Sequence, residues 1–461
     1  MNPDMSISNG RVVTSDGSFE AAVLVEDGRI VAVGDEKVLP EADSRVDAEG
    51  LLVMPGVVDP HVHVDIEPAH RVGDFRSETR AAAVGGTTTI VDFAWQGLDR
   101  TVLDPEATIV DGVEYKRSLA EGEALVDYGF HGAIIRERPE SLEQIRPAIE
   151  AGVTSFKMYR STYHWGVSNG FVDAVMKRLA GSGAVAVMHT EDPSICEALT
   201  EQFKREGKGS PEWYPKSRPD YAEAMSAADA ARLATEAGAK YYGIHTTCRK
   251  AADVLAQFRE DGSKLRAETC THYTVLDESI HAEMGNLPLI APPIRPLDDV
   301  DAMFEHLRDG TLSVVSTDHC EYKRRSKDVE NWWESPFGAN SLQTSLPVFY
   351  DEAVNRRGHS PSFVVELMCR NPAETFGLES KGHIGVGYDA DIVLFDPETT
   401  YTITADDNVS NADFTMYEGR EVTGRVERTY VRGELVAADG EPVGPGGHGV
   451  YQPRAIPDWE A

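Results

Sequence analysis

The sequence predicts an α/β protein: a (β/α)8 barrel of the TIM type, with a small β-sandwich domain built from both ends of the chain. The middle of the chain contains eight short apolar runs, which is the number of strands in such a barrel. Charged, alanine-rich segments of helical character separate these runs, for example 226–237 and 300–308. Both ends of the chain, in contrast, have the pattern of short strands joined by turns.

Residues 1–56 and 380–440 contain the short strands of the predicted sandwich. In the first part, two turn pairs typical of β-hairpins stand between apolar stretches: Asn9-Gly10 and Asp27-Gly28. In the second part, 390–396 and 428–436 have the composition of strands. Because the two ends share this pattern, we expect them to form one small β domain that the barrel interrupts.

Residues 57–379 contain the predicted barrel. The eight apolar runs are 56–61, 87–93, 126–134, 153–158, 184–189, 241–245, 265–270 and 312–318. Most intervals between them are long enough for a crossover helix. The intervals 189–245 and 270–318 are longer, and we expect them to carry extra loops over the top of the barrel. Residues 441–461 are rich in Gly and Pro, so we expect a C-terminal arm or a loosely ordered tail.

The chain is strongly acidic: 44 Lys and Arg against 77 Asp and Glu give a formal net charge of −33. Such a surface repels nucleic acid and anionic lipid, so neither is an expected partner. Acidic residues are spread along the chain, which favours adaptation to a salt-rich cytoplasm, as in halophilic proteins, over an ordinary acidic enzyme. We find no stretch of eighteen apolar residues and no secretory signal, so the expected location is the cytoplasm.

Six residues able to bind metal or carry charge stand at the ends of separate apolar runs: His61, His63, Lys157, His189, His245 and Asp318. The carboxyl ends of barrel strands face the active site, so these side chains are expected to converge there. The first two histidines are two residues apart on one strand and therefore point to the same side. Each residue alone has a structural explanation, such as a hydrogen-bonded histidine or a capping aspartate. Six of them on one face indicate a hydrolase with a metal centre.

Four histidines and one aspartate are more ligands than one catalytic zinc ion needs, because such an ion keeps about three protein ligands and one open position. A site for two cations, about 3.5–4 Å apart, fits this number better. Lys157 does not fit this scheme by itself, since an ammonium group cannot ligate a cation.

Seven motifs are spread over nearly the whole chain: 58–65 (VDPHVHVD), 85–93 (GGTTTIVDF), 127–131 (DYGFH), 154–159 (TSFKMY), 268–273 (ETCTHY), 316–320 (STDHC) and 381–391 (KGHIGVGYDAD). As a set they resemble the hydantoinase/dihydropyrimidinase branch of the amidohydrolase superfamily. The resemblance implies that CO2 carbamylates Lys157 to N6-carboxylysine, whose carboxylate bridges two metal ions. It also implies one ion on His61, His63 and Asp318 and the other on His189 and His245. Zinc is the usual ion of this family, and manganese is the alternative.

The resemblance further implies hydrolysis of a C–N bond in a cyclic amide. A metal-bridging hydroxide would attack a ring carbonyl and open a 5,6-dihydropyrimidine or a hydantoin to an N-carbamoyl amino acid. Asp318 would accept the hydroxide proton and return it to the leaving ring nitrogen. In this family a tyrosine in the loop after the lysine donates to the oxyanion. Here Tyr163 is the first candidate, with a one-residue change of loop length, and Tyr159 is the second.

The family binds its substrate ring largely through backbone groups. The corresponding segments here are 291–295, which begins with Ala291 in place of a family serine, and 335–343, where Asn340 is the candidate contact. Both departures are allantoinase-like, whereas residues 64–66 after the histidine pair differ from allantoinases and dihydroorotases. Allantoinase is therefore the alternative activity, and a dihydroorotase or a non-catalytic scaffold relative ranks below it.

The expected partners are a small cyclic amide and further copies of the chain, since relatives are often tetramers; a dimer is the second possibility. The loop 159–169 is rich in aromatic residues, Trp165 among them. These side chains either form a wall for an apolar ring substituent or pack the loop onto the barrel.

Overall fold

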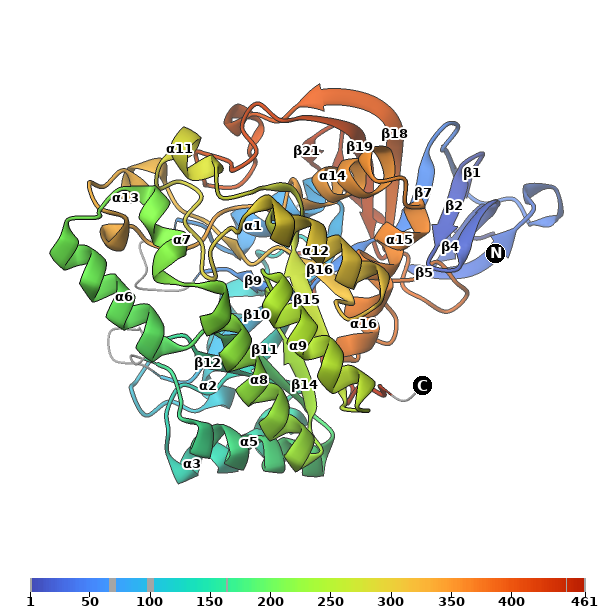
Figure 1. Ribbon diagram of the computed structural model, residues 1–461. Helices are drawn as coiled ribbons and strands as arrows, with labels where there is room; N and C mark the ends of the chain where they lie inside the picture. Colours follow the sequence, from blue (N-terminus) through green and yellow to red (C-terminus); the bar gives the residue numbers. More distant parts are fainter. Residues whose placement is uncertain (1, 66–71, 98–102, 163–164, 445, 460–461) are drawn as a thin grey trace.

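A computed structural model describes residues 2–65, 72–97, 103–162, 165–444 and 446–459 of the chain. It consists of a barrel surrounded by helices and a smaller β domain at one side (Figure 1). None of the described helices combines the length and hydrophobicity that a membrane span requires.

Eight parallel strands form the barrel, and each corresponds to one of the eight predicted runs. They are β8 (Val57–Asp59), β10 (Thr87–Trp95), β11 (Asp127–Ala133), β12 (Ser155–Arg160), β13 (Val185–Thr190), β14 (Lys240–Gly243), β15 (Leu265–Cys270) and β16 (Val314–Ser316). Each strand pairs with the next along the chain. Beyond the ends of β8 and β16, the short strands β9 (Val62–His63) and β17 (His319–Cys320) pair in parallel. This pair joins the first and last strands, so the prediction of a (β/α)8 barrel is confirmed.

The helices lie mainly on the outside of the barrel (Figure 1). They are α1 (Phe75–Val84), α2 (Ile109–Ala120), α3 (Pro139–Glu143), α4 (Ile145–Glu150), α5 (Asn169–Ser182), α6 (Pro193–Glu206), α7 (Tyr214–Ser217), α8 (Asp220–Ala237), α9 (Arg249–Glu260), α10 (Thr271–Val275), α11 (Ile280–Met284), α12 (Leu297–Arg308), α13 (Arg324–Lys327), α14 (Ser345–Tyr350), α15 (Pro361–Val365) and α16 (Asn371–Phe376), with π-helical η4 (Asp351–Arg356) and η5 (Glu366–Arg370). The predicted helical segments 226–237 and 300–308 fall in α8 and α12. The two long intervals carry additional helices, namely α6 with α7 and α10 with α11.

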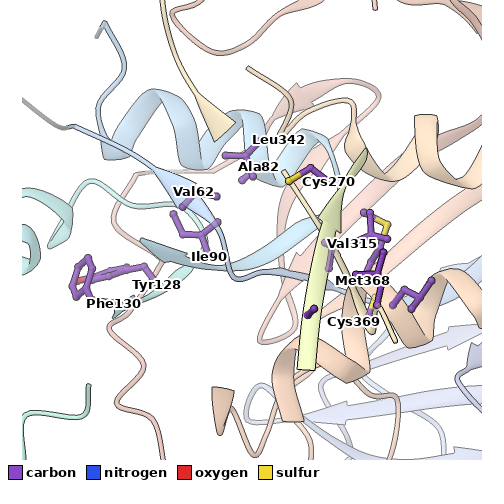
Figure 2. Close-up of a cluster of buried hydrophobic side chains, with 14 of the residues drawn as sticks. Val62, Ala82, Ile90, Tyr128, Phe130, Cys270, Val315, Leu342, Met368 and Cys369 are labelled. Atoms are coloured by element: carbon purple, nitrogen blue, oxygen red, sulfur yellow. The ribbon is translucent and has the colours of Figure 1, made fainter. Parts of the chain in front are cut away.

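Local capping explains where several helices begin and end. Ser168 precedes α5 and accepts a hydrogen bond from the N–H of Phe171, and Gly183 ends the helix in the left-handed conformation. Asp192 and Gly207 have the same roles at the two ends of α6. Buried side chains of strands and helices then form one large core cluster, part of which is drawn in Figure 2. Six of its labelled members lie on or beside the barrel strands: Val62, Ile90, Tyr128, Phe130, Cys270 and Val315.

The small domain consists of two sheets to which both ends of the chain contribute, as predicted. One sheet has the order β5 (Arg29–Gly34), β4 (Ala22–Glu26), β1 (Met5–Ser8), β6 (Ser44–Asp47). The other has the order β21 (Glu441–Pro442), β20 (Glu434–Ala438), β19 (Glu421–Val431), β18 (Ile392–Thr402), β7 (Leu52–Pro55), β2 (Arg11–Thr14), β3 (Gly17–Glu20). In Figure 1 the blue N-terminal strands lie beside the orange C-terminal ones. Side chains of both sheets share a core that includes Ile7, Val23, Val53 and Ile392.

The two predicted turns behave differently. Asp27-Gly28 joins the antiparallel strands β4 and β5, and both residues have positive φ, as a two-residue hairpin requires. Asn9-Gly10 joins β1 to β2, which belong to different sheets, so the prediction of a hairpin there is wrong. A Cβ atom at Gly10 would lie 2.5 Å from the side chain of Val53, which explains why this crossing needs glycine.

Residues 446–459 lie against the barrel rather than forming a loosely ordered tail, which was one of the two alternatives for this segment. The N–H of Tyr128 donates to the carbonyl of Val450 (3.2 Å), and the N–H of Gln452 donates back to the carbonyl of Tyr128 (2.7 Å). Further along, the indole of Trp459 donates to the carbonyl of Thr375 (3.1 Å). Glycine and proline in this segment therefore permit an extended path along the barrel, fixed by backbone hydrogen bonds, rather than disorder.

Candidate metal centre

The six predicted ligands all lie at the carboxyl ends of barrel strands and are all buried. Lys157 and His189 belong to β12 and β13, His63 forms part of β9, and the other three each lie two residues beyond the end of β8, β14 or β16. They form two groups, which we call the first ligand group (His61, His63 and Asp318) and the second ligand group (His189 and His245).

In the first ligand group, Oδ1 of Asp318 lies 3.1 Å from Nε2 of His61 and 3.2 Å from Nε2 of His63. The three ligand atoms lie within 4.8 Å of one another. Burial alone would raise the pKa of Asp318, but the two imidazoles hold it well below its usual range. The group therefore presents an ionised carboxylate and two imidazole nitrogens to one point.

In the second ligand group, Nδ1 of His189 faces Nε2 of His245 at 3.0 Å, and the rings are edge to face with centroids 4.2 Å apart. Nε2 of His189 lies 2.8 Å from a carboxylate oxygen of Glu191. This contact assigns the ring proton of His189 to Nε2, so its Nδ1 carries the lone pair that faces His245.

Lys157 lies between the two ligand groups. Its Nζ is 4.9 Å from the ring centroid of Phe93, which stacks on His63, and 4.7 Å from that of Tyr159, which lies beside His189. Burial lowers the pKa of Lys157 to about 7, although nearby carboxylates oppose the shift. A large fraction of this amine is therefore neutral and nucleophilic near neutral pH.

Two of the ligands have strained backbones. The φ angles of His245 and Asp318 are 38° and 47°, in the left-handed region that residues other than glycine rarely adopt. Hydrogen bonds from neighbouring strands hold this region in place: the N–H of His61 donates to Asp59 (3.0 Å), and the hydroxyl of Thr317 donates to the other oxygen of Asp59 (2.6 Å). Both side chains meet other predicted ligands: Asp318 lies beside His61 and His63, and His245 lies beside His189.

Buried carboxylates that the sequence analysis did not single out fix the orientation of the histidines. Glu268 accepts hydrogen bonds from Nδ1 of His61 (2.5 Å), the hydroxyl of Tyr242 (2.8 Å) and the N–H of His245 (3.2 Å). It therefore connects both ligand groups and leaves Nε2 of His61 as the ligand atom. An acidic residue near the carboxyl end of a predicted barrel strand was the signal that could have identified it.

Glu191 has the corresponding position behind the second ligand group. It contacts His189 and also forms an ion pair with Arg218 at 2.8 Å. Burial would raise the pKa of Glu191, but Arg218 and His189 together lower it to about 2, so the carboxylate stays ionised. The available signal was an acidic residue two positions after His189, just beyond the end of β13.

Another buried group of metal-ligand residue types, Glu78, His319 and Glu321, lies next to the first ligand group. Nδ1 of His319 accepts the N–H of Ser341 (3.0 Å), so its proton is on Nε2, which donates to Glu78 (2.8 Å). This imidazole has no lone pair left for a cation. The group instead supports the backbone beside Asp318.

The two expected substrate segments lie side by side, because the N–H of Gly338 donates to the carbonyl of Leu289 (2.9 Å). Asn340 lies beside Ala339, which bridges to His319, and its buried side-chain oxygen makes no hydrogen bond within the described residues. Ala291 is half-buried. Tyr163 lies outside the described residues.

The second tyrosine candidate, Tyr159, is buried and stacks on Trp95, with ring centroids 5.3 Å apart. Trp165 packs edge to face on the same indole, with centroids 6.4 Å apart, and is itself 37% exposed. Trp165 therefore packs onto the barrel and still presents part of its ring to solvent.

The side chains present fit divalent cations. Imidazole nitrogens with a carboxylate are a common donor set for zinc and similar ions. Nε2 of His61 is buried and makes no well-formed hydrogen bond within the described residues; its neighbour at 3.1 Å is Oδ1 of Asp318, another predicted ligand, as expected around an ion site. A (β/α)8 barrel with such a donor set at the carboxyl ends of its strands defines a class, the metal-dependent barrel hydrolases.

Comparisons with known proteins agree with this class. The model of the Amidohydrolase family matches residues 52–436. A D-hydantoinase of Streptomyces coelicolor is 34% identical over 466 residues, covering 97% of each chain, and an allantoinase of Escherichia coli is 32% identical over 459 residues, covering 97% of this chain and 98% of the relative. The crystal structure of dihydropyrimidinase from Brevibacillus agri NCHU1002 superposes with a TM-score of 0.94 at 30% identity, covering 98% of this chain and 99% of that one.

The chain therefore belongs to the Amidohydrolase family. Its resemblance to the hydantoinase/dihydropyrimidinase branch is confirmed, and the protein is a hydrolase.

Proposed function

We propose that this hydrolase opens the ring of a cyclic ureide or imide, a 5,6-dihydropyrimidine or a hydantoin, and releases an N-carbamoyl amino acid. The observation that carries the proposal is the pair of ligand groups with Lys157 between them at the mouth of the barrel. The similarity to a D-hydantoinase and a dihydropyrimidinase over nearly the full chain supports the choice of ring.

We assign one divalent ion to the first ligand group and another to the second, with zinc as the first choice and manganese as the second. Lys157, as N6-carboxylysine formed from CO2, would bind both. Its neutral amine in a buried site is the form that reacts with CO2, and the product carboxylate would supply the negative charge that two cations require. When bound, the ions supply a hydroxide nucleophile near neutral pH and positive charge beside the carbonyl under attack.

The protein's own groups then handle the proton and the ring. We assign the role of base to Asp318, an ionised carboxylate in the first ligand group, which would accept a proton at Oδ1 or Oδ2. The same carboxyl, once protonated, is the acid that protonates the leaving ring nitrogen. Tyr163, or Tyr159 in its place, would donate a hydrogen bond to the oxygen that becomes negative.

We assign recognition of the ring to the backbone of Ala291 and to Asn340. Within the described residues, neither the N–H nor the carbonyl of Ala291 is hydrogen-bonded, so both are available to a ligand. The buried side-chain oxygen of Asn340 lacks a donor in the same way. Both groups belong to adjacent segments, which would place them on one side of a bound ring.

The charge and the assembly are also part of the proposal. The net charge of −33 fits a protein that works in a salt-rich cytoplasm, where ions screen the repulsion between its acidic residues. We expect a homo-oligomer, a tetramer or a dimer, which sedimentation at high and low salt would distinguish.

The test is ring opening at high salt, with added zinc or manganese, across dihydrouracil, hydantoin, a 5-aryl hydantoin, allantoin and dihydroorotate. Faster opening of dihydrouracil or the hydantoins supports the proposal and names the substrate. Opening of allantoin alone would make the protein an allantoinase and overturn the choice of ring. No turnover of any ring by protein that holds two metal ions would reject the substrate class.

A further inference from the structure

The segment from Asn286 to Arg295 is irregular and buried, with one exception. Ala291 alone in this segment has partial solvent access. Its N–H and carbonyl make no hydrogen bond in the part of the chain that the structure describes. A backbone donor and acceptor without partners inside an otherwise buried loop are unusual, because such groups are nearly always satisfied.

The backbone carbonyls around Ala291, in contrast, are held by buried side chains from three different helices. Lys327 of α13 donates to the carbonyl of Leu289 (2.8 Å). Tyr214 of α7 donates to the carbonyl of Ile290 (2.7 Å), and Tyr273 of α10 donates to that of Pro292 (2.6 Å). The loop is therefore tied on both sides of Ala291.

These three donors are costly to bury. Lys327, Tyr214 and Tyr273 are each at most 2% exposed. Lys327 lies near the rings of Tyr322 and Phe414, with its Nζ 5.6 Å and 5.9 Å from their centroids. A buried ammonium or hydroxyl group is stable only where it is hydrogen-bonded, so each donor favours the loop conformation that offers its carbonyl.

We propose that Lys327, Tyr214 and Tyr273 are positioning residues that hold the backbone of Ala291 ready to bind the –NH–C(=O)– edge of the substrate ring. An amide within a small ring is cis, so its N–H and C=O lie on the same side. One residue that offers both a free carbonyl and a free N–H can satisfy that edge. This inference rests on the proposed function, because it assigns a role in binding the same ring.

The test compares Tyr214→Phe, Tyr273→Phe and Lys327→Met with the wild-type holoenzyme on the best cyclic substrate. Each tyrosine variant leaves a buried carbonyl without its donor, so the expected KM rises by about 5-fold or more. The expected rise for Lys327→Met is smaller, because the N–H of Gly338 still donates to Leu289. The kcat should stay within about 2-fold, and the metal content should not change, since no metal ligand is touched.

A matched control is Tyr417→Phe. Tyr417 is as buried as the other two tyrosines, and its hydroxyl has no hydrogen-bond partner within the described residues. Its removal should leave KM unchanged. A second readout uses the substrate methylated on the ring nitrogen of that edge, which cannot donate to Ala291. The KM effect of the tyrosine variants should then shrink, because one of the two contacts that they position is already absent.

An unchanged KM in both tyrosine variants, or a fall in kcat accompanied by loss of metal, would overturn the positioning role. Equal KM effects on the methylated and unmethylated substrates would do the same. These outcomes differ from failure of the proposed function, in which the wild-type protein itself opens no cyclic amide.

Discussion

Replacing Glu268 by glutamine gives the sharpest test of the metal centre, because this one carboxylate contacts members of both ligand groups. It accepts hydrogen bonds from His61 at 2.5 Å, Tyr242 at 2.8 Å and His245 at 3.2 Å. Glutamine has the same shape but no charge, and one of its two polar atoms is a donor. A hydrogen bond to a charged acceptor contributes about 1.5–3 kcal/mol, and one between neutral groups about 0.5–1.5 kcal/mol.

The difference of about 1–2 kcal/mol corresponds to a loss of metal affinity of about 5- to 30-fold. The assay is a competition titration with a chelator, read as bound metal per chain, together with kcat at saturating metal. Asp351→Asn is the matched control, since Asp351 is also buried and accepts three hydrogen bonds, from Asn355, Arg356 and Thr423. It should lose stability but no metal affinity. Wild-type metal affinity in the glutamine variant would refute the role assigned to Glu268.

Three further predictions concern two of the buried lysines, Lys157 and Lys327. Lys157→Ala should remove bound metal and activity together, as measured by metal analysis and turnover, and a metal-loaded, active variant would contradict its role as a bridging ligand. Metal-stripped protein at a fixed CO2 concentration should regain activity with zinc about tenfold more slowly at pH 6 than at pH 8, because burial lowers the pKa of Lys157 to about 7 and only the neutral amine reacts with CO2. Burial also lowers the pKa of Lys327 to about 7 from its ordinary 10.5, so the unfolded chain binds more protons between these values and stability rises with pH. Lys327→Met should therefore raise the free energy of unfolding most at or below pH 7. In unfolding experiments this gain over the wild type should fall by about 1.4 kcal/mol per pH unit towards pH 10. A gain that does not depend on pH would refute this interpretation.

The sequence was sufficient to predict the barrel because each strand is a short apolar run bounded by turns. Such runs must be buried on both faces, and parallel strands covered by helices bury them in this way. It was also sufficient to predict that the six candidate ligands lie close together, since a residue at a strand's carboxyl end has its position set by the barrel itself. His61 and Asp318 are 257 positions apart in the numbering, yet their side chains meet because β8 and β16 are the first and last strands of the barrel sheet.

Contacts that depend on three-dimensional packing were not visible in the sequence. Glu268 occurs in a motif that the sequence analysis quoted, but its three donors come from separate elements, so its role required the structure. The turn at Asn9-Gly10 has the composition of a hairpin, and only the assignment of β1 and β2 to different sheets excludes one. The C-terminal segment has no periodic pattern because its stability comes from hydrogen bonds to the barrel backbone, such as those of Tyr128.

The position of Ala291 shows why substrate choice is the hardest property to infer from such a chain. If the ring is bound by a backbone N–H and carbonyl, the side chain at that position carries little information, and an alanine there is compatible with more than one ring. The groups that discriminate between substrate rings are then the side chains that position the backbone around Ala291, which come from α7, α10 and α13. A change of substrate can thus arise from residues that never touch the ring, through a shift of the loop by a fraction of an ångström. Mutagenesis of ring preference should therefore target the buried donors behind the loop rather than the residues that line the pocket.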